Sequence, residues 1–504
     1  MNNLKDYVNW KLTHADKTAE AEGYPLIMEN CKANKQMKQL EIYGNSFQDG
    51  TPTPDNPIEV QSVGEMSVNL FDISSYPLVN NRVIYGHSGE YGTVSGYAAT
   101  HVYIPCTELQ GKTITINHTA GANVGIAFYD ESKVYISGEK YSNATSKTVT
   151  IPNDAIYYRF SVDANYIDEI QIQEGSVATE YEPYGKYKIP IVQRGTNLIN
   201  VNDFKNGNFK VSADGSCTLS WTLSNRFGAY NTKLSHIPAG SKLVFKTSIL
   251  EATTNYKYVL IQLTYSNGTT KYLTCLDSTR ITLEDTIKQV GLYIHNSEEK
   301  GSYITFNDFG LYYENEYTGY ESYVEPTTTN VFLNEPLRKI GGYADYIDSA
   351  KSKVVRAIKQ QIINGTESFK RFNGAYPYSL IEIGEPGYVV DDVCLCNNLT
   401  HQPNFSISRE GINTFRIFNS YSNYSARIAF RIYVDGEPLR ENDTVKFMQD
   451  KYASGTPVIF YYVLSEPYEE SIDCDLPKLN AKTSIIEVDT SITPSDAYGK
   501  YIKR

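Results

Sequence analysis

The chain has 504 residues, more than one hydrophobic core usually supports, so three or four domains of roughly 100–150 residues each are expected. Its net charge of −12 argues against wrapping nucleic acid or docking on an anionic membrane, because both need basic patches. The 43 tyrosines, set against 2 tryptophans and 5 methionines, favour half-buried strands over helices and also suit exposed binding faces.

Neither a membrane span nor a secretion signal is predicted. No segment approaches roughly 18 consecutive apolar residues, and the first residues, Met-Asn-Asn-Leu-Lys-Asp, lack the apolar centre of a signal peptide. The chain is therefore expected to be made in the cytoplasm and kept soluble. Its cysteines are odd in number and scattered, which predicts free, mostly buried thiols and no disulfide framework. They are Cys31, Cys106, Cys217, Cys275, Cys394, Cys396 and Cys474.

Residues 1–66 are predicted to form a separate N-terminal region. Apolar residues between Leu4 and Leu12 recur at three- and four-residue steps, which indicates a short amphipathic helix. Two strand-like runs follow and lead to three prolines within residues 52–57, which exclude helix and inner strand and predict an extended arm. The helix and the arm together are the natural anchor of the chain.

An internal repeat covers the next part of the chain. Asn-Leu-Phe-Asp at residues 69–72 returns as Asn-Leu-Ile-Asn at residues 197–200, and the segments that close the two units also match. Many short strands with Gly and Asn turns predict two tandem antiparallel sandwiches of jelly-roll type, at residues 67–186 and 187–326. The matching strands are expected at residues 113–117, 124–129 and 157–162 in the first unit and at 242–247, 258–265 and 289–294 in the second.

Residues 327–504 are expected to form a third sandwich of different topology. A linker-like Glu-Pro-Thr-Thr-Thr run comes before it, and a polar end follows its last strand. The fold class predicted for the whole chain is mainly β, with tandem antiparallel β-sandwiches. The strand signals in this last part lie at residues 354–363, 379–383, 414–419, 426–434, 458–463 and 484–488.

No constellation of catalytic residues stands out. The seven histidines are scattered singly, and neither a glycine-rich phosphate loop nor a Gly-x-Ser-x-Gly turn occurs. Cys394 and Cys396 would share one face of a strand, but no second cysteine pair exists to complete a zinc site, so two buried core neighbours are expected. The chain is predicted not to be an enzyme and to need no cofactor.

Carboxylates are numerous, and a catalytic pair among them is left open. Asp391 with Asp392, or Asp163 with Asp168 and Glu169, could flank a glycosidic bond, but solvated loop acids are the simpler interpretation. Loop carboxylates could also hold a structural calcium ion, although the twelve-residue calcium loop pattern is absent. No metal ligand is therefore assigned.

Aromatic clusters in turns are the better candidates for function, because sugars bind by stacking a ring face on an aromatic side chain while polar neighbours take the hydroxyl groups. For each cluster the alternative is a rim that caps a sandwich or packs on a sister chain. Three places fit, in the first repeat, in the second repeat and in the last third. The candidate ligand-binding residues are Tyr85 and Tyr91, then Trp221, Arg226 and Tyr230, then Tyr376, Tyr421 and Tyr424.

Several segments resemble tail and minor structural proteins of phages and prophages of Gram-positive gut bacteria. The resemblance rests on residues 40–65, with Gln-Asp-Gly-Thr-Pro-Thr-Pro-Asp-Asn-Pro at their centre, and on the Asn-Leu-Phe-Asp motif that follows. Residues 173–184 resemble the end of the carbohydrate-binding-module-like sandwiches in those proteins. Residues 335–348 and 462–467 resemble the start and the end of their distal domain.

The resemblance implies a receptor-binding adhesin in the virion tail, part of a fibre, tip or baseplate, that meets cell-wall or capsular polysaccharide of the host. It implies contacts with other tail or baseplate proteins through the N-terminal region and, by analogy, a homotrimer. A contractile bacteriocin-like particle would use the same part. Two alternatives stay open: a purely structural baseplate or tail-tip component, and a glycan depolymerase. Neither nucleic-acid binding nor membrane insertion is expected.

Overall fold

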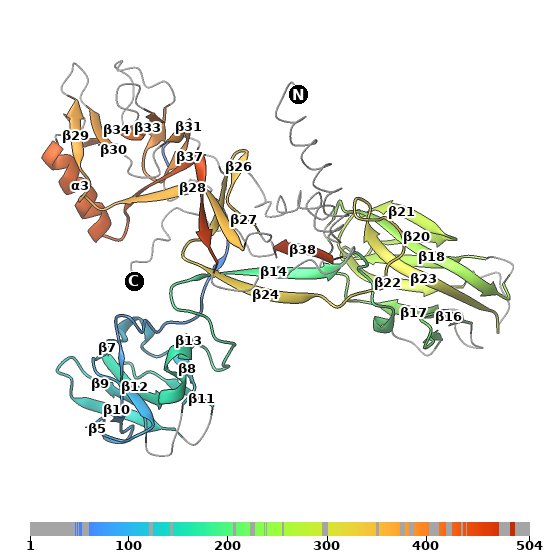
Figure 1. Ribbon diagram of the computed structural model, residues 1–504, viewed down its shortest axis with the longest axis horizontal. Helices are drawn as coiled ribbons and strands as arrows, with labels where there is room; N and C mark the ends of the chain where they lie inside the picture. Colours follow the sequence, from blue (N-terminus) through green and yellow to red (C-terminus); the bar gives the residue numbers. More distant parts are fainter. Residues whose placement is uncertain are drawn as a thin grey trace, which may run out of the picture. The chain divides into compact units, whose positions relative to one another are not determined.

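Alternating apolar and polar side chains give this chain a series of mainly antiparallel sheets, drawn in the computed structural model of Figure 1. The mainly β prediction is confirmed. No helix in the described part of the chain is long and apolar enough to cross a membrane. Two compact units are present, one with residues 191–329 and 484–488, the other with residues 60–190 and 330–472. The structure describes residues 46, 48, 50–52, 60–119, 124–141, 145–204, 208–221, 227–235, 237, 239–254, 257–294, 301–348, 352–372, 378–382, 388–402, 413–419, 426–434, 437–439, 441–472 and 484–488.

Most of the predicted N-terminal region lies outside the described residues, including the helix near Leu4 and the run of prolines after Pro52. Its last residues are part of two sheets. Strand β1 (Gln61–Val63) pairs with β25 (Leu337–Ile340), which pairs with β26 (Tyr343–Ala344). Strand β2 (Glu65–Met66) pairs with β14 (Tyr187–Gly195). The same sheet also contains β24 (Thr327–Leu333) and β38 (Ser484–Val488).

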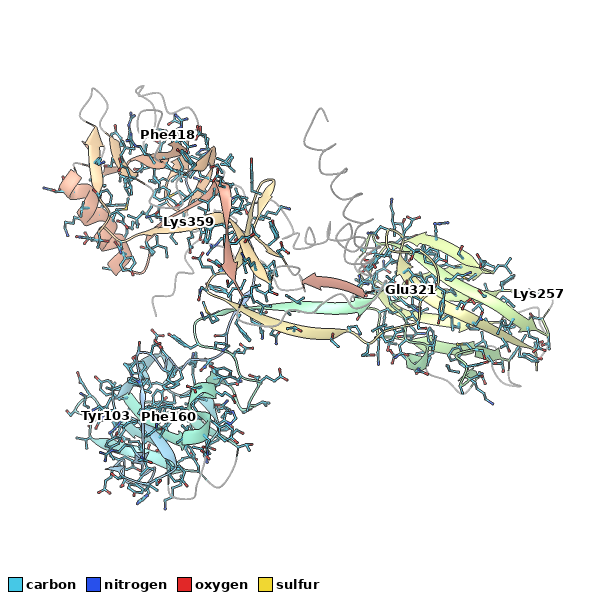
Figure 2. The ribbon with its side chains drawn as sticks, in the orientation of Figure 1. Tyr103, Phe160, Lys257, Glu321, Lys359 and Phe418 are labelled. Atoms are coloured by element: carbon cyan, nitrogen blue, oxygen red, sulfur yellow. The ribbon has the colours of Figure 1, made fainter. Side chains whose placement is uncertain are left out.

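The first sandwich encloses one core between two sheets. Side chains of β12 alternate, so Tyr158 and Phe160 enter this core; Phe160 is labelled in Figure 2. There Phe160 meets the Phe71 ring edge to face, with the ring centres 5.1 Å apart. One sheet has the order β10 (Tyr135–Lys140), β9 (Gly125–Tyr129), β12 (Tyr157–Asp163), β6 (Tyr97–Thr100) and β3 (Leu78–Asn80), with β7 (Ile104–Pro105) beside β12; the other has β11 (Ser146–Thr150), β8 (Thr113–Asn117) and β13 (Ile172–Glu174). A hairpin of β4 (Val83–Ile84) and β5 (Tyr91–Gly92) and the 3-10 helices η2 (Thr107–Leu109) and η3 (Ala164–Glu169) complete it.

The second sandwich repeats this two-sheet design with a core of its own, made mostly of Leu, Ile, Val and Phe side chains. One sheet has the order β15 (Phe209–Val211), β16 (Cys217–Ser220), β23 (Tyr303–Tyr313), β18 (Lys242–Ala252) and β21 (Ser278–Thr282). The other has β17 (Phe227–Asn231), β22 (Ile287–Tyr293), β19 (Val259–Tyr265) and β20 (Thr270–Cys275), and the 3-10 helix η4 (Val201–Asp203) precedes both.

The asparagine of the repeated motif makes equivalent hydrogen bonds in both sandwiches. The Asn69 amide oxygen accepts hydrogen bonds from the N–H groups of Phe71 and Ile172 at 3.0 and 3.1 Å, and its amide nitrogen donates to two carbonyl oxygens. Asn197 accepts from Ile199 and Leu311, both at 3.1 Å, and also donates to a carbonyl oxygen. A buried asparagine therefore ties the first residues of each sandwich to its last strand.

The C-terminal domain is a two-layer structure with one feature that the sequence analysis did not predict, helix α3 (Glu441–Ala453). Only Thr444 and Met448 of this helix are fully buried, so its apolar stripe is thin. The acidic first turn, Lys451 in the last turn and Gly455 just beyond are the signals that could have revealed it. One sheet has the order β27 (Tyr346–Asp348), β28 (Lys353–Ile363), β37 (Val458–Ser471) and β31 (Val389–Cys396); the other has β29 (Phe369–Phe372), β30 (Tyr378–Glu382), β34 (Ala426–Arg431), β33 (Thr414–Asn419) and β32 (Thr400–His401), and β35 (Tyr433–Val434) pairs with β36 (Glu437–Pro438).

The cysteine prediction is confirmed for the five cysteines that the structure describes. All five are free and buried, and burial raises the pKa of each thiol. Cys394 and Cys396 both belong to one core of the C-terminal domain, as their spacing on a strand predicted. Cys31 and Cys474 lie outside the described residues.

Candidate functional site

The structure describes four of the eight predicted ligand-binding residues; Arg226, Tyr376, Tyr421 and Tyr424 lie outside the described residues. Trp221 is half-buried against the core of the second sandwich. Tyr230 lies on β17, directly opposite Gly291 of β22. Tyr85 packs against the core of the first sandwich. Tyr91 is brought into a cluster of rings and cations, and this cluster is the candidate site.

The centre of the cluster is Arg159, which leaves β12 on the face opposite to Tyr158 and Phe160. Its side chain is 6% exposed, and its guanidinium lies 4.5 Å from the ring centre of Tyr91 and 5.0 Å from that of Tyr103. Nε and Nη2 donate to the carbonyl oxygen of Thr100 at 3.2 and 2.8 Å. The buried cation is therefore held by two ring faces and one carbonyl group.

Further cations extend the cluster at both ends. The Arg82 guanidinium lies 5.3 Å from the ring centre of Tyr91. The exposed Lys133 is 5.2 Å from the ring centre of Tyr103 and 6.0 Å from that of Tyr157. The three tyrosines are half-buried, so each keeps an edge or part of a face toward solvent. We call this surface the cation–tyrosine ladder; it consists of Arg82, Tyr91, Arg159, Tyr103, Lys133 and Tyr157.

The ladder carries positive charge that the protein does not neutralise locally. Within the described residues, none of Arg82, Lys133 and Arg159 forms an ion pair with a carboxylate. The nearby Asp130 carboxylate instead accepts a hydrogen bond from the N–H group of Val134 at 2.9 Å, which closes the turn after β9. Three cations among aromatic rings favour a ligand with anionic or hydroxyl oxygens.

Close backbone packing holds the ladder in place. A Cβ atom on Gly86 would lie 2.2 Å from the Glu139 carbonyl oxygen, and one on Gly125 would lie 2.0 Å from the same oxygen, so only glycine lets the β4–β5 hairpin approach the sheet. The hydroxyl groups of Tyr129 and Tyr135 donate to carbonyl oxygens of this hairpin at 2.7 and 3.0 Å. Burial raises the pKa of Tyr129 to about 12, with Arg159 opposing, so its hydroxyl stays a donor. Tyr91, on the hairpin, is thereby fixed over Arg159.

The same face of the second sandwich lacks the ladder. Strand β9 of the first sandwich and β19 of the second each end in a turn closed by one backbone hydrogen bond. The N–H group of Asp130 donates to the Val134 carbonyl oxygen, and that of Tyr265 donates to the Thr269 carbonyl oxygen, so these two turns align the strands. With β9 and β19 aligned in this way, their registers place Gly291 where the first sandwich has Arg159, and Gln289 where it has Tyr157. The second sandwich therefore lacks the counterparts of Arg159 and Tyr157, so the shared two-sheet design does not require a cation or a ring at these two positions.

Most of the ladder was missed by the sequence analysis, which named only Tyr91 from it. The strand at residues 157–162 was predicted, and its alternation alone puts Tyr157 and Arg159 on one face. Arg82, Tyr103 and Lys133 come from three other segments, so their approach depends on the tertiary fold. The available signal was a cation two residues after a tyrosine, on the same face of a predicted strand.

Asp391 and Asp392, two of the five carboxylates that were considered for catalysis, have structural partners. Asp391 accepts hydrogen bonds from the backbone and side-chain nitrogens of Asn419 at 2.9 and 2.7 Å. Asp392 pairs with Arg416 at 3.0 Å and lies 3.7 Å from His401, whose pKa is lowered by burial. Within the described residues, no three or more His, Cys, Asp or Glu side chains gather in a group that could hold a metal ion.

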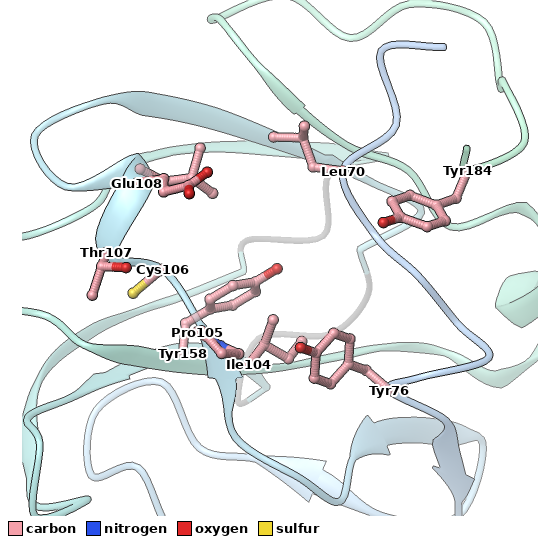
Figure 3. Close-up of a pocket in the computed structure, with 10 residues that line it drawn as sticks. Leu70, Tyr76, Ile104, Pro105, Cys106, Thr107, Glu108, Tyr158 and Tyr184 are labelled. Atoms are coloured by element: carbon pink, nitrogen blue, oxygen red, sulfur yellow. The ribbon is translucent and has the colours of Figure 1, made fainter. Parts of the chain in front are cut away.

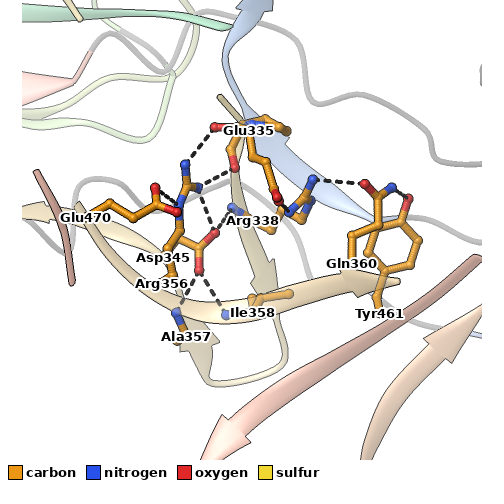
Figure 4. A network of polar contacts seen from close by, with 10 residues as sticks. Glu335, Arg338, Asp345, Arg356, Ala357, Ile358, Gln360, Tyr461 and Glu470 are labelled. Atoms are coloured by element: carbon orange, nitrogen blue, oxygen red, sulfur yellow. Dashed lines mark hydrogen bonds and ion pairs between the residues drawn. The ribbon is translucent and has the colours of Figure 1, made fainter. Parts of the chain in front are cut away.

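A buried ionic network in the C-terminal domain is also saturated by the protein itself (Figure 4). Arg356 and Asp345 are almost fully buried and pair at 3.3 Å, and Arg356 also reaches Glu470 at 3.0 Å. The second Asp345 oxygen accepts from the N–H groups of Ala357 and Ile358 at 2.8 and 2.9 Å. This network fixes β28 and its neighbours and offers no free group to a ligand.

Neither a protein-family model nor a curated protein matches this chain. Among solved structures, the chain is similar to the N-terminal tandem of CBM22-1 and CBM22-2 domains of Xyn10C from Paenibacillus barcinonensis. The similarity covers 53% of this chain and 99% of that chain, at 10% sequence identity and a TM-score of 0.23.

Proposed function

We propose that this chain is a non-catalytic, glycan-binding component of a phage tail or a related particle, and that the cation–tyrosine ladder contacts polysaccharide on a bacterial surface. One observation carries the proposal: the Arg159 guanidinium lies against the rings of Tyr91 and Tyr103, without an ion pair among the described residues, where the aligned position of the second sandwich is Gly291. The tail setting is supported by the resemblance of residues 40–72 to phage tail proteins.

The chemistry of the ladder suits a polymer with hydroxyl and acidic groups. Half-buried tyrosine rings offer apolar edges to sugar rings at little cost in side-chain freedom. Lys133 and Arg82 lie at the ends of the ladder and can donate to phosphate or carboxylate groups of the polymer. Weak sites of this kind gain strength when several copies are fixed in one particle.

The binding part is tested with the full chain on an array of bacterial cell-wall and capsular polysaccharides. Tyr103→Ala and Tyr157→Ala should each weaken binding to a recognised polymer by about tenfold, because each removes a ring from the ladder. The matched control is Tyr272→Ala, which removes a tyrosine that is 61% exposed on β20 of the second sandwich. Equal binding by all three variants, or no binding to any polymer, would leave a purely structural role in the particle as the better account.

The particle part needs a separate measurement. Particles purified from a culture that produces the chain should contain it, as read by mass spectrometry and by antibody labelling in electron microscopy. A chain found only outside the particles contradicts the tail assignment. Release of reducing ends from a bound polysaccharide would contradict the non-catalytic assignment and favour a depolymerase.

A further inference from the structure

A second feature of the first sandwich lies on the core side of β12. It is a pocket of about 350 Å³, which is within the size range of small-ligand sites, roughly 300–1,000 Å³. Its walls come from four segments: the loop before β3, the stretch from β7 to η2, strand β12 and the loop before β14. Figure 3 shows the side chains of Tyr76, Tyr158 and Tyr184 around the space between Leu70 and Ile104, with Glu108 on its far side.

Three polar groups of the pocket have no hydrogen-bond partner among the described residues. The Tyr158 side chain is only 2% exposed, and its hydroxyl makes no hydrogen bond with any described residue. The same holds, within the residues that the structure describes, for the Tyr76 hydroxyl and the Glu108 carboxylate. Burial raises the pKa of Tyr158, so its hydroxyl keeps its proton and can donate. A buried hydroxyl without a partner is unfavourable unless something else bonds to it.

The second sandwich shows that the fold does not require these hydroxyl groups. The repeated motif aligns Tyr76 with Phe204, since each lies seven residues after the buried asparagine. The strand registers align Tyr158 with Val290. Phe204 and Val290 both belong to the hydrophobic core of the second sandwich. The first sandwich therefore has two tyrosines in place of apolar core residues, and their hydroxyl groups face the pocket, which favours a polar ligand there.

We propose that this pocket binds a single pyranose residue that carries no negative charge, either a neutral sugar or an amino sugar. The Tyr76 and Tyr158 hydroxyls can exchange hydrogen bonds with ring hydroxyl groups, and the Glu108 carboxylate can accept from a hydroxyl or an ammonium group. Leu70, Ile104 and the tyrosine rings supply apolar surface for the sugar ring. Glu108 is the one charged side chain among the ten lining residues, so an acidic sugar is repelled.

The pocket and the ladder differ in chemistry and lie on opposite sides of the same strand. Tyr157 and Arg159 point to the cationic outer face, and Tyr158 points to the acidic pocket. The pocket proposal therefore does not depend on the ladder. One sandwich would hold two classes of sugar, an acidic polymer outside and an uncharged or amino sugar within.

The test uses the full chain and saturation-transfer NMR with glucose, galactose, glucosamine, N-acetylglucosamine and glucuronate. Tyr158→Phe should lower the affinity for the recognised sugar by about fivefold or more, since it removes one hydroxyl and keeps the ring. The matched control is Tyr141→Phe, which removes the hydroxyl of another fully buried tyrosine in the same core, outside the pocket. Its binding should equal that of the unaltered chain.

Charge gives a second, independent arm. Glu108→Gln should weaken glucosamine most and should admit glucuronate, which the unaltered chain is expected to reject. Tyr103→Ala, which alters the ladder, should leave monosaccharide binding unchanged, so a failure of the ladder and a failure of the pocket give different results. Saturation transfer from none of the five sugars would overturn the proposal. Binding that Tyr158→Phe and Glu108→Gln both leave unchanged would also overturn it.

Discussion

The two sandwiches share a scaffold and differ in what they place on it. Both begin with a buried asparagine that ties the first segment to the last strand. Strands β9 and β19 also end in turns closed by the same backbone hydrogen bond. The first sandwich has Arg159, Tyr157 and Tyr158 on β12, where the second has Gly291, Gln289 and Val290 on β22. Positions that set the fold are therefore separable from positions that differ in chemistry, and the proposed binding sites lie where the two sandwiches differ.

The largest expected effect tests the shared part of this comparison. Asn69→Ala and Asn197→Ala should each lower the free energy of unfolding of their own sandwich by roughly 3–4 kcal/mol, because each leaves buried N–H groups without acceptors. Hydrogen exchange read by mass spectrometry can assign the loss to one sandwich. The exposed Asn165 provides the control, since Asn165→Ala should cost little. A large effect from only one of the two buried asparagines would break the structural equivalence.

A smaller effect is expected where the sandwiches differ. Arg159→Ala should destabilise the first sandwich by roughly 2–3 kcal/mol, because two cation–ring contacts and the bonds to Thr100 are lost. Arg159→Lys should recover little of this, since an ammonium group cannot fill the planar space between Tyr91 and Tyr103. Thermal unfolding followed by circular dichroism measures both variants. Full recovery by lysine would mean that charge alone, without ring packing, holds the ladder.

The strands were more predictable than the sites that they carry. Residues 113–117 and 414–419 were predicted as strands with the bounds that β8 and β33 have, because their alternation is local to the sequence. Helix α3 was missed because, among its described side chains, only Thr444 and Met448 are fully buried, while Val445 and Phe447 are partly buried against the core. The ladder and the pocket are each formed by four or more segments that are separate in the sequence. Local sequence patterns do not predict which of these segments come together in the fold.

The candidate residues show the same limit. Tyr85 and Tyr91 are six residues apart, yet one packs on the core and the other lies over Arg159. The sequence shows that this stretch is rich in aromatic side chains, but the side that each ring takes is decided by the hairpin that Gly86 allows to pack closely. The functional value of a tyrosine-rich turn is thus set by its tertiary neighbours.

Thiol reactivity gives a kinetic comparison of the two cores. Burial raises the pKa of Cys106 and Cys217 to about 12 and that of Cys275 to about 11, so at pH 8 the first two are ionised to about one part in 10,000. Iodoacetamide should therefore label them slowly in the native chain and quickly in denaturant, as followed by mass spectrometry. Cys106 lines the pocket and should react first of the three. Labelling of Cys217 before Cys106 would show that the second sandwich opens more readily.

The same shifts predict a pH dependence of stability, the smallest effect. A thiol with a raised pKa binds its proton more tightly in the folded chain than in the unfolded chain, where the pKa is about 9. Stability contributed by the protonated thiols is therefore present below pH 9 and is lost as the pH rises from about 9 toward 12. Cys106→Ala should flatten this decline in the first sandwich only, and Cys217→Ala in the second only. Unfolding by urea at pH 8 and pH 10, read separately for each sandwich by hydrogen exchange, would detect it; a decline that neither variant changes would have to come from other groups.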